Sequence, residues 1–547
     1  MHLVLIETTG NQQYIFATNK LRENVGASEL IVRVGTQFVM DAVAAVGGPA
    51  WRTQTGASSS DATIAALRQL LRNASSNPPI ESGQKPVEVV VATSGKALLL
   101  VQDAKVGEDI IAAVTRAAVE HAPGLQVHGV LSKPFDFATD PIHAVIKQTH
   151  IRHASAGAAL ASQITRFPSL PVVAECRSSG LPAKRLARSS EIPEAATAPY
   201  PASAEVLAKR AAQPSWLKRV RELQHRSGLD ARLVDSLRQL EDAYPDMDWI
   251  AVIHADGNGL GGVFLDFDKV IKNSAQNTAA ANRYYIDTLR RFSIALDECT
   301  EAAFCTAAKT LRTARDRLPI VPLVLGGDDL TVLCDGRQAL EFAVQYIRQF
   351  QAEAAKHADV RPVMKAVIKR DLTASVGVAI VKPHFPFHRA YDLAEELLRS
   401  AKDHKPHAAI DFQVVYDASV IDLDSMRAYW ELADGVRLTA RPYLIDDPSD
   451  PEQPSRHWTW LETCVKHLRQ EGADGRRLLP RTQLHALREA LFEGRKVADA
   501  QLKLIYDRYD TLSKLFPHRT LFESFDGDGS AVTYLIDAME VDELGSK

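Results

Sequence analysis

The sequence predicts a mixed α/β (α+β) fold in which one βαββαβ unit is followed by a second. Each half opens with an apolar strand, at 2–7 and at 249–255, and later contains two strands separated by a short turn, of two residues in the first half and four in the second. Strands this close together form a hairpin. Helical segments lie between and after the strands, so each half has the element order of a ferredoxin-like unit.

In the first half, a long helical stretch runs from residue 12 to about residue 46, and we expect a break near Gly26. The remaining elements are two hairpin strands, a helix, a strand and a helix, at 87–93, 96–102, 104–121, 125–131 and 141–166. In the second half, a Gly-rich turn precedes long helices over 278–315. The elements after them are two hairpin strands, a helix, a strand, a helix and a strand, at 319–325, 330–334, 337–357, 372–381, 389–404 and 410–416.

These patterns divide the chain into four parts. The first unit spans 1–166 and the second spans 247–421. Between them, 167–246 is a connector that is rich in Pro, Ala and Ser and then becomes helical and basic. Residues 422–547 form a helical C-terminal domain, with helices expected at 458–470, 481–492 and 498–515. The basic connector residues form a solvated helical face or a contact for RNA or a partner: Lys184, Arg185, Arg188, Lys209, Arg210, Lys218, Arg219 and Arg221.

Bulk composition places the chain among ordinary globular proteins. Of its 547 residues, 46% are apolar and 24% are charged, and the net charge of −4 favours neither nucleic acid nor membrane as a partner. The five cysteines are scattered without a C-x-x-C pair, so the sequence supports neither a disulfide framework nor a zinc site. The N-terminus lacks a signal-peptide pattern, and no apolar stretch approaches the roughly 20 residues that span a bilayer. We expect a cytoplasmic protein.

Three aspartates are the candidate metal ligands. Asp256 stands at the carboxyl end of the strand that opens the second unit, and Asp328 and Asp329 lie in the hairpin turn. In a βαββαβ sheet the first and third strands are neighbours, so the hairpin can approach Asp256. Mg²⁺ prefers carboxylate oxygens and phosphates, and phosphoryl or nucleotidyl transfer uses such metals.

Glycines surround these aspartates. Gly326 and Gly327 permit positive φ in a tight turn and let a triphosphate approach the backbone. The segment 256–262, Asp-Gly-Asn-Gly-Leu-Gly-Gly, can cradle phosphates with its N–H groups. Either motif alone is usually a solvated turn, and the second lacks the downstream Glu of an EF-hand. Their occurrence together, about 70 residues apart and each at the end of the right strand, favours a functional site.

The two halves can be aligned by eye. Residues 9–11 (Thr-Gly-Asn) align with 256–258 (Asp-Gly-Asn), and 93–96 align with 326–329. In this alignment Thr9, Gly95 and Lys96 replace the three aspartates. The sequence therefore predicts a duplicated fold with one chemically active copy.

Four features of the second half together resemble a known family. They are the strand followed by residues 256–259, the apolar strands around 326–329, the segment 374–379 (Ala-Ser-Val-Gly-Val-Ala) and Ala401-Lys402. They resemble the second palm domain of the large polymerase/cyclase subunit of type III CRISPR effector complexes. That palm is related to diguanylate cyclase (GGDEF) domains and to polymerase palms. Residues 19–30 look like the first helix region of the subunit's first palm, so the resemblance covers most of 1–420.

The resemblance implies that ATP, with Mg²⁺ or Mn²⁺, is converted into cyclic oligoadenylate second messengers in antiviral defence. It implies that Asp256, Asp328 and Asp329 bind the metal, with the carbonyl of Gly257 as a further ligand. The implied nucleotide-binding residues are Gly257, Asn258, Gly259, Gly326, Gly327, Ser375 and Lys402. Lys402 can instead be a solvated helix-end lysine, and Ser375 can be a small residue packed in the sheet.

If the two units face each other, the first unit holds the acceptor nucleotide through Asn19, Arg22, Ser28 and Ser94, although Arg22 and Glu23 can instead be a structural pair. The chain departs from the family in lacking a His-Asp dipeptide, so we expect no nuclease activity. Only Cys176 remains where the family carries a zinc module, so we expect no zinc. RNA, other subunits of such a complex and a second copy of the chain stay open as partners.

Two other functions remain open at this stage. The palm pair can be a non-catalytic ATP-binding scaffold of an RNA-guided complex. It can also perform another palm chemistry, as a diguanylate cyclase or a polymerase. The intact aspartates favour a metal-dependent nucleotide cyclase over the scaffold, and Asp328-Asp329 fits the CRISPR-type palm better than GGDEF enzymes, which carry Glu in the hairpin.

Overall fold

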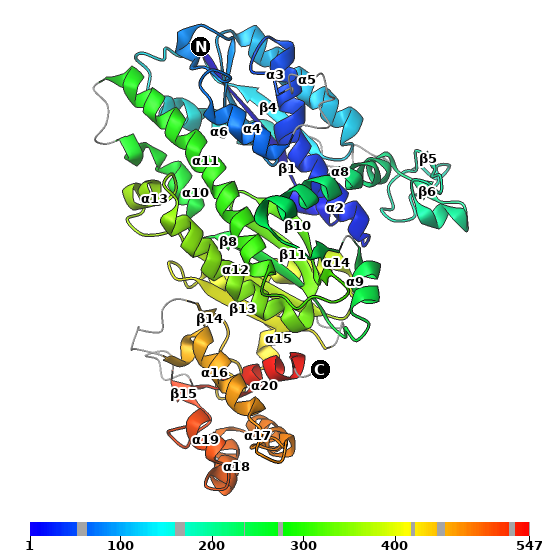
Figure 1. The fold of residues 1–547 in the computed structure, drawn as a ribbon, viewed down its shortest axis with the longest axis vertical. Helices are drawn as coiled ribbons and strands as arrows, with labels where there is room; N and C mark the ends of the chain where they lie inside the picture. Colours follow the sequence, from blue (N-terminus) through cyan, green and yellow to red (C-terminus); the bar gives the residue numbers. More distant parts are fainter. Residues whose placement is uncertain are drawn as a thin grey trace.

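The mixed α/β fold is confirmed. A computed structural model describes residues 1–51, 63–158, 170–234, 236–271, 277–416, 422–445, 454–524 and 531–545. Two large sheets follow one another along the long axis of the molecule, and the helical C-terminal part lies at the opposite end from the first sheet (Figure 1). The strand order is β2-β3-β1-β4 in the first sheet and β10-β11-β8-β12-β13-β14 in the second.

In the first unit, the predicted strands and helices lie close to their predicted positions. The strands are β1 (His2–Thr9), β2 (Val87–Thr93), β3 (Lys96–Val101) and β4 (Gln126–Leu131). The helices after the hairpin are α5 (Ala104–His121) and α6 (Ile142–Ala158). The end of the helix predicted to continue to residue 166 lies outside the described residues.

The helical stretch before the hairpin differs from the prediction. It consists of α1 (Asn11–Ile15), α2 (Leu21–Arg33), a π-helical turn and α3 (Val39–Ala45). The break falls at 16–20, so the break predicted near Gly26 is wrong. Gly26 lies inside α2. Glycine is needed at this position because the backbone of Lys209 passes close by: a Cβ on Gly26 would lie 1.8 Å from the carbonyl oxygen of Lys209. A further helix, α4 (Ile64–Arg72), was not predicted.

In the second unit, the central strands are β8 (Ile250–Gly257), β10 (Ile320–Gly326), β11 (Asp329–Asp335) and β12 (Ala374–Val381). The helices are α10 (Leu260–Leu265), α11 (Thr278–Ala308), α12 (Gly336–Lys356), α13 (Arg361–Val367) and α14 (Phe387–Lys402). As predicted, the hairpin strand β11 pairs with β8. The order β10-β11-β8-β12 repeats β2-β3-β1-β4, which supports the predicted duplication.

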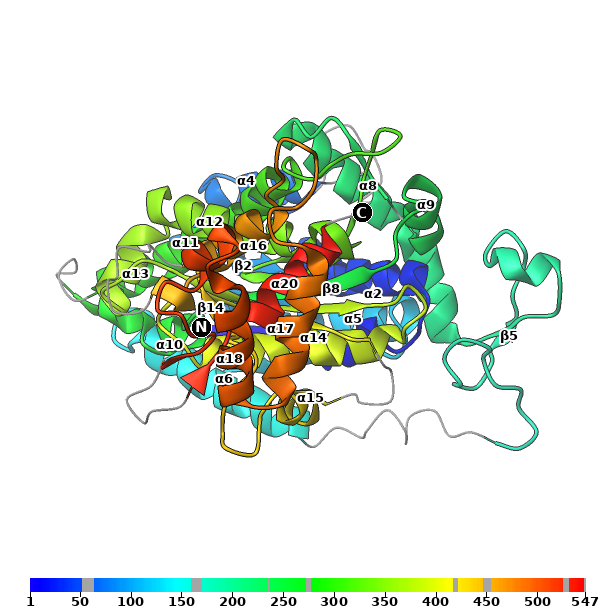
Figure 2. The ribbon, with the colours of Figure 1, turned by 90° about the horizontal axis from the view of Figure 1, so that it is seen from below.

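Helix α8 (Ala204–Ser227) of the connector packs along α2. Its basic residues are largely engaged within the chain. Lys209 is completely buried and bonds to Glu205 at 2.5 Å and to the carbonyl oxygen of Tyr14 at 2.6 Å. Arg210 is also buried and pairs with Glu23 at 3.0 Å, so the solvated face predicted for these residues is wrong at both positions. The short strands β5 (Arg185–Leu186) and β6 (Pro201–Ala202) project away from the two sheets (Figure 1 and Figure 2).

The C-terminal part is mostly helical, as predicted, and it also extends the second sheet. Its helices are α15 (Leu423–Tyr429), α16 (Trp458–Arg469), α17 (Arg481–Phe492), α18 (Arg495–Tyr506), α19 (Asp510–Leu515) and α20 (Leu535–Leu544). Strand β14 (Tyr443–Leu444) pairs with β13 (Ala409–Val414). Buried Arg441 donates to Asp537 of α20 and to the carbonyl oxygen of Phe412 in β13, each at 2.8 Å. Among the described helices, none is long and apolar enough to cross a membrane.

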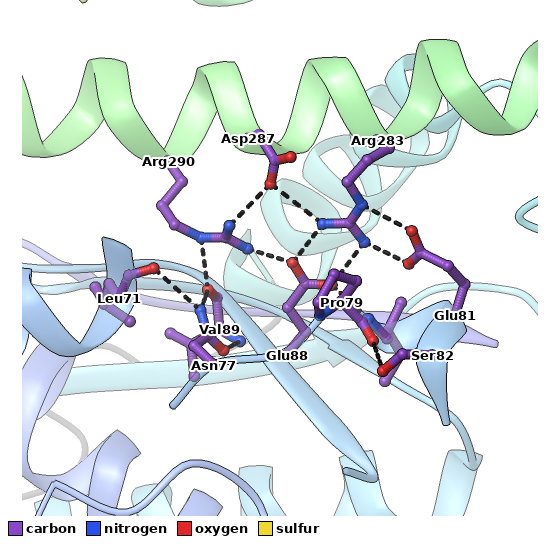
Figure 3. A network of polar contacts seen from close by, with 11 residues as sticks. Leu71, Asn77, Pro79, Glu81, Ser82, Glu88, Val89, Arg283, Asp287 and Arg290 are labelled. Carbon is purple, nitrogen blue, oxygen red and sulfur yellow. Dashed lines mark hydrogen bonds and ion pairs between the residues drawn. The ribbon is translucent and has the colours of Figure 1, made fainter. Parts of the chain in front are cut away.

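A buried charge network joins the two units (Figure 3). Glu88 of β2 is completely buried and accepts hydrogen bonds from Arg283 and Arg290 of α11. Asp287, between the two arginines on α11, bonds to both, and Arg283 also pairs with Glu81. Burial alone would raise the pKa of Glu88, but the arginines outweigh burial and lower it. Glu88 is therefore ionised and fixes α11 against the first sheet.

We predict that Glu88→Ala lowers the free energy of unfolding by about 3–5 kcal/mol, because it leaves buried Arg290 and partly buried Arg283 short of an acceptor. Urea unfolding followed by circular dichroism measures this loss. Glu81→Ala is the matched control: it removes a more exposed partner of Arg283 and should cost less than about 1 kcal/mol. Equal effects of the two substitutions would contradict the central role of Glu88.

Candidate functional site

The register of the second sheet brings the predicted aspartates together at the ends of two neighbouring strands. On one side of β8, Leu330 of β11 pairs with Ala255, and extending this register by one residue places Asp329 opposite Asp256. The next step places Asp328 opposite Gly257. On the other side of β8, Ser375 of β12 pairs with Asp256. Directly opposed residues project to the same face of a sheet, so Asp256, Asp329 and Ser375 form one row across three strands.

Asp328 lies against the backbone of Gly257. A Cβ on Gly257 would come within 3.0 Å of the Asp328 carboxylate oxygen Oδ2, so glycine leaves the space that this carboxylate fills. The N–H of Gly257 donates to it, but desolvation dominates and raises the pKa of Asp328. Desolvation of its carboxyl, followed by the charge of Asp328, raises the pKa of Asp329 to about 7, although part of this residue is exposed. Among the described residues, neither of these two carboxyl groups forms an ion pair with a cationic side chain, so the turn gathers two acidic groups.

Asp256 is in contact with Lys402, the last residue of α14. Helix α14 packs directly on the sheet at Gly377, where a Cβ would lie 2.1 Å from the carbonyl oxygen of Ala394. Desolvation, followed by the charge of nearby Lys405, lowers the pKa of Lys402 to about 8. Lys402 is thus placed at the row of side chains, and the alternative of a solvated helix-end lysine is not supported.

Two glycines of the motifs adopt left-handed backbone conformations. Gly327 has φ +64° in the hairpin turn, and Gly259 has φ +83° at the start of α10. Positive φ at the first central residue is typical of a type II′ hairpin turn. The prediction of positive φ at Gly326 is wrong, because this residue ends β10 in extended conformation and pairs with Asp329.

Asn258 and Ser375 are buried and bonded to each other. The Ser375 hydroxyl donates to the Asn258 side-chain oxygen at 3.1 Å, and the Asn258 amide donates to Thr373 Oγ1 and to the carbonyl oxygen of His407, each at 3.1 Å. Asn258 therefore ties the turn after β8 to the start of β12 and to the loop after α14. Ser375 is fully buried, as the sheet-packing alternative expects, and the nucleotide-binding role of both residues stays a prediction.

The donor set suits a hard divalent cation, because Asp256, Asp328 and Asp329 offer carboxylate oxygens at adjacent strand positions. Within the described residues, however, no three His, Cys, Asp or Glu side chains are gathered closely enough to form a complete metal site. The ammonium of Lys402 neutralises Asp256 instead. The raised pKa values of Asp328 and Asp329 indicate carboxylates that would be stabilised by a bound cation.

Several residues near the site were missed in the sequence. His254 lies two residues before Asp256, bonds to Thr331 at 2.9 Å and contacts Tyr391 of α14; burial and the charge of Lys402 lower its pKa to about 4, so it is neutral. The guanidinium of Arg370 lies beside Gly259, 3.4 Å from where a Cβ would be. None of these belongs to a recognisable motif.

The first unit carries a different row at the equivalent place. Lys96 of β3 follows its hairpin turn as Asp329 does, and the residue opposite Lys96 is Glu7. Gly10, three residues after Glu7, starts α1 with φ +66°, just as Gly259 follows Asp256. Glu7 is therefore the counterpart of Asp256, and the alignment of Thr9 with Asp256 is wrong by two residues.

Glu7 is neutralised within the first unit. Its carboxylate bonds to Lys96 at 2.6 Å and contacts His153 of α6 at 3.3 Å. His128, opposite Glu7 on β4, stacks on His153 with ring centroids 3.9 Å apart. The first unit thus retains an acidic residue at the place of Asp256, but a lysine occupies the place of Asp329.

Comparison with known protein families assigns this arrangement. Residues 249–410 match the model of the Cas10/Cmr2 second palm domain. The second unit is similar to the second palm domain of Cas10/Cmr2. The match covers β8, the turn at 326–329, β12, α14 and Lys402, so it contains every site residue described above in this unit. We refer to the second unit as the second palm from here on.

Solved structures resemble the chain over its full length. The Csm1–Csm4 cassette in complex with pppApA has 12% identity to the chain and a TM-score of 0.49, and the chain covers 69% of it. The same cassette in complex with cA4 gives 12% identity, a TM-score of 0.48 and 70% coverage. Csm1 in T. onnurineus has 13% identity to the chain and a TM-score of 0.47, and the chain covers 69% of it. A comparison with curated protein sequences finds no match.

We predict that Asn258→Ala lowers the free energy of unfolding by about 2–4 kcal/mol, because three hydrogen bonds are lost and their buried partners stay unsatisfied. Ser375→Ala is the matched control and should cost about 1 kcal/mol, since it removes only one of these bonds. Urea unfolding monitored by hydrogen exchange over the second palm measures both. An equal loss for the two variants would show that the Thr373 and His407 bonds contribute nothing.

Proposed function

We propose that the protein is a metal-dependent nucleotidyltransferase that converts ATP into cyclic oligoadenylate-type second messengers. The observation that carries the proposal is the placement of Asp256 opposite Asp329, with Asp328 against Gly257, at the open edge of the second palm. Antiviral defence is the setting that similarity to this palm family favours.

The proposed reaction joins a ribose hydroxyl of one nucleotide to the α-phosphorus of another and releases pyrophosphate. Asp256, Asp328 and Asp329, with the carbonyl of Gly257, would hold Mg²⁺ or Mn²⁺. A metal bound there would lower the pKa of the attacking hydroxyl and compensate the charge of the triphosphate. The chain itself positions the carboxylates through the β8–β11 register and offers Lys402 as a cation for the phosphates.

The backbone around the turns supports binding of a triphosphate. Gly259 and Gly327 leave the backbone open to a ligand. Among the described residues, no atom lies within 4 Å of a Cβ placed on Gly327, and Arg370 alone approaches a Cβ placed on Gly259. The guanidinium of Arg370 adds a positive charge beside the turn after β8. We propose that these groups receive the phosphates, with Asn258 holding the turn in shape.

The test is incubation of the full chain with ATP or with GTP in the presence of Mg²⁺ or Mn²⁺, followed by mass spectrometry of the products. Asp329→Asn should reduce product formation by about 10²–10³-fold, since metal ligands contribute several kcal/mol to transition-state stabilisation. Asp371→Asn is the control: Asp371 is a nearby carboxylate that pairs with Lys365 at 2.9 Å, and its loss should leave the rate unchanged.

The outcomes separate the candidate functions. ATP binding without any oligonucleotide product, alone or with added RNA, would favour the scaffold function. Product from GTP in place of ATP would favour diguanylate cyclase chemistry. Undiminished product from Asp329→Asn would refute the metal site.

Lys402 provides a second test. We predict that Lys402→Met raises the KM for ATP about tenfold through loss of a charge-assisted contact to the triphosphate, whereas Lys402→Arg retains most of the affinity. Initial rates at varied ATP concentration measure this. Arg399→Met is the control, because Arg399 lies in the same last turn of α14 but is exposed and pairs with Glu395. An unchanged KM in Lys402→Met would limit Lys402 to neutralising Asp256.

Assembly with other subunits of a type III complex remains part of the proposal. The internal pairing of Lys209, Arg210 and Arg219 makes this face of α8 a poor candidate for RNA binding. Homo-oligomerisation stays open.

A further inference from the structure

The turn that carries Asp328 and Asp329 is bonded to α11 through both backbone groups of Gly327. The N–H of Gly327 donates to Oδ1 of Asp297, and the hydroxyl of Thr300 donates to the Gly327 carbonyl oxygen at 2.6 Å. Neither bond belongs to the β10–β11 ladder, whose last pair is Gly326 and Asp329. Together they fix the peptide planes on both sides of Gly327, directly before Asp328.

Such fixation matters at this position. Gly327 is the residue with the greatest backbone freedom in the turn, and its conformation sets the direction of the next side chain. Asp297 and Thr300 lie three residues apart and hence on one face of α11. This helix is 31 residues long and is fixed against the first unit by the Glu88 network. The turn is therefore held from a rigid element outside its own hairpin.

Asp297 is held in turn by the first unit. Arg68 of α4 approaches Oδ2 of Asp297 at 3.5 Å and donates two hydrogen bonds of 2.9 Å to Glu301, one helical turn further along α11. Arg68 and Asp297 are only 6% and 8% exposed. A carboxyl group buried to this degree is costly without a polar partner. Burial raises the pKa of Asp297 and the charge of Arg68 opposes that shift, and the contact with Arg68 holds Oδ2 while Oδ1 faces Gly327.

We propose that Asp297 and Thr300 are positioning residues for the metal-binding turn and that Arg68 gives the first unit control over that turn. The relay runs from Arg68 to Asp297 to Gly327, and its end is the residue that precedes Asp328. The inference rests on the proposed function, because it takes the turn to carry the metal ligands.

The chain supplies a matched control on the same two helices. Arg72, one turn after Arg68 on α4, donates to both oxygens of Glu298 on α11, at 2.7 and 2.6 Å. No contact is recorded between Glu298 and the turn among the described hydrogen bonds and ion pairs. Arg72→Ala thus removes a second α4–α11 pair, one more exposed than the pairs of Arg68, without touching the relay.

The experiment compares Asp297→Ala, Asp297→Asn, Thr300→Val, Arg68→Ala and Arg72→Ala in the full chain. The first readout is amide hydrogen exchange of the peptide that covers 324–331. We expect exchange to rise about tenfold in Asp297→Ala and Thr300→Val, each of which loses a hydrogen bond of Gly327. Asp297→Asn should retain most of the protection, because its amide oxygen still accepts from Gly327. Arg68→Ala should raise exchange and Arg72→Ala should not.

The second readout is the rate of product formation. A misplacement of about 1 Å can cost on the order of 10²-fold in rate, so we expect kcat to fall about 10–100-fold in Asp297→Ala and Arg68→Ala while the KM for ATP changes less than about threefold. Rates are measured well below each variant's unfolding midpoint, and Asp297→Asn should recover most of kcat.

Three results would overturn the inference: unchanged exchange at 324–331 in Asp297→Ala, equal effects of Arg68→Ala and Arg72→Ala, or equal loss in Asp297→Ala and Asp297→Asn. If the wild-type chain forms no product, the proposed function fails, whereas exchange and Mn²⁺ binding measured by electron paramagnetic resonance still decide the relay. Weaker Mn²⁺ binding in Asp297→Ala, but not in Arg72→Ala, supports it.

Discussion

The antiparallel register between β8 and β11 is the constraint on which the site depends. It sets Asp256 opposite Asp329 and Asp328 opposite Gly257, so a shift by one residue would send these side chains to the other face. The apolar residues of both strands fix this register, because each is buried in the sheet. The carboxylates lie at the edge where the apolar run ends, and burial of the sheet compensates for their repulsion.

The same register in the first unit leads to a different electrostatic solution. Lys96 lies opposite Glu7 where Asp329 lies opposite Asp256, so a lysine side chain of the first unit itself neutralises the carboxylate. Its row of side chains is neutral without any ligand. In the second palm Asp256 contacts Lys402, which belongs to the neighbouring helix α14 and not to the paired strand. Duplication thus produced one self-neutralised sheet edge and one that stays open to cations.

The sequence predicted most strands and both hairpins because alternation, apolar runs and short turns are local signals. The proximity of Asp256 to the hairpin followed from strand order. The pairing of Glu7 with Lys96 was missed because the similar residues at 9–11 and 256–258 suggested an alignment. The correct alignment follows from the strand register counted from the hairpin turn. Arg68, in the unpredicted helix α4, bonds to Glu301 across 233 positions, and no local pattern marks such a pair. The burial of Lys209 was missed for the same reason, because the sequence does not distinguish a buried lysine from an exposed one.

The buried network around Glu88 also determines how the chain can be divided. A fragment that began at 247 would contain every aspartate of the site, yet Arg283 and Arg290 would then face water from a helix shaped to meet β2. The first unit alone would likewise expose Glu88, which has no accessible surface in the full chain. The two sheets therefore form one cooperative body, and a cut in the connector would divide a core rather than release a domain.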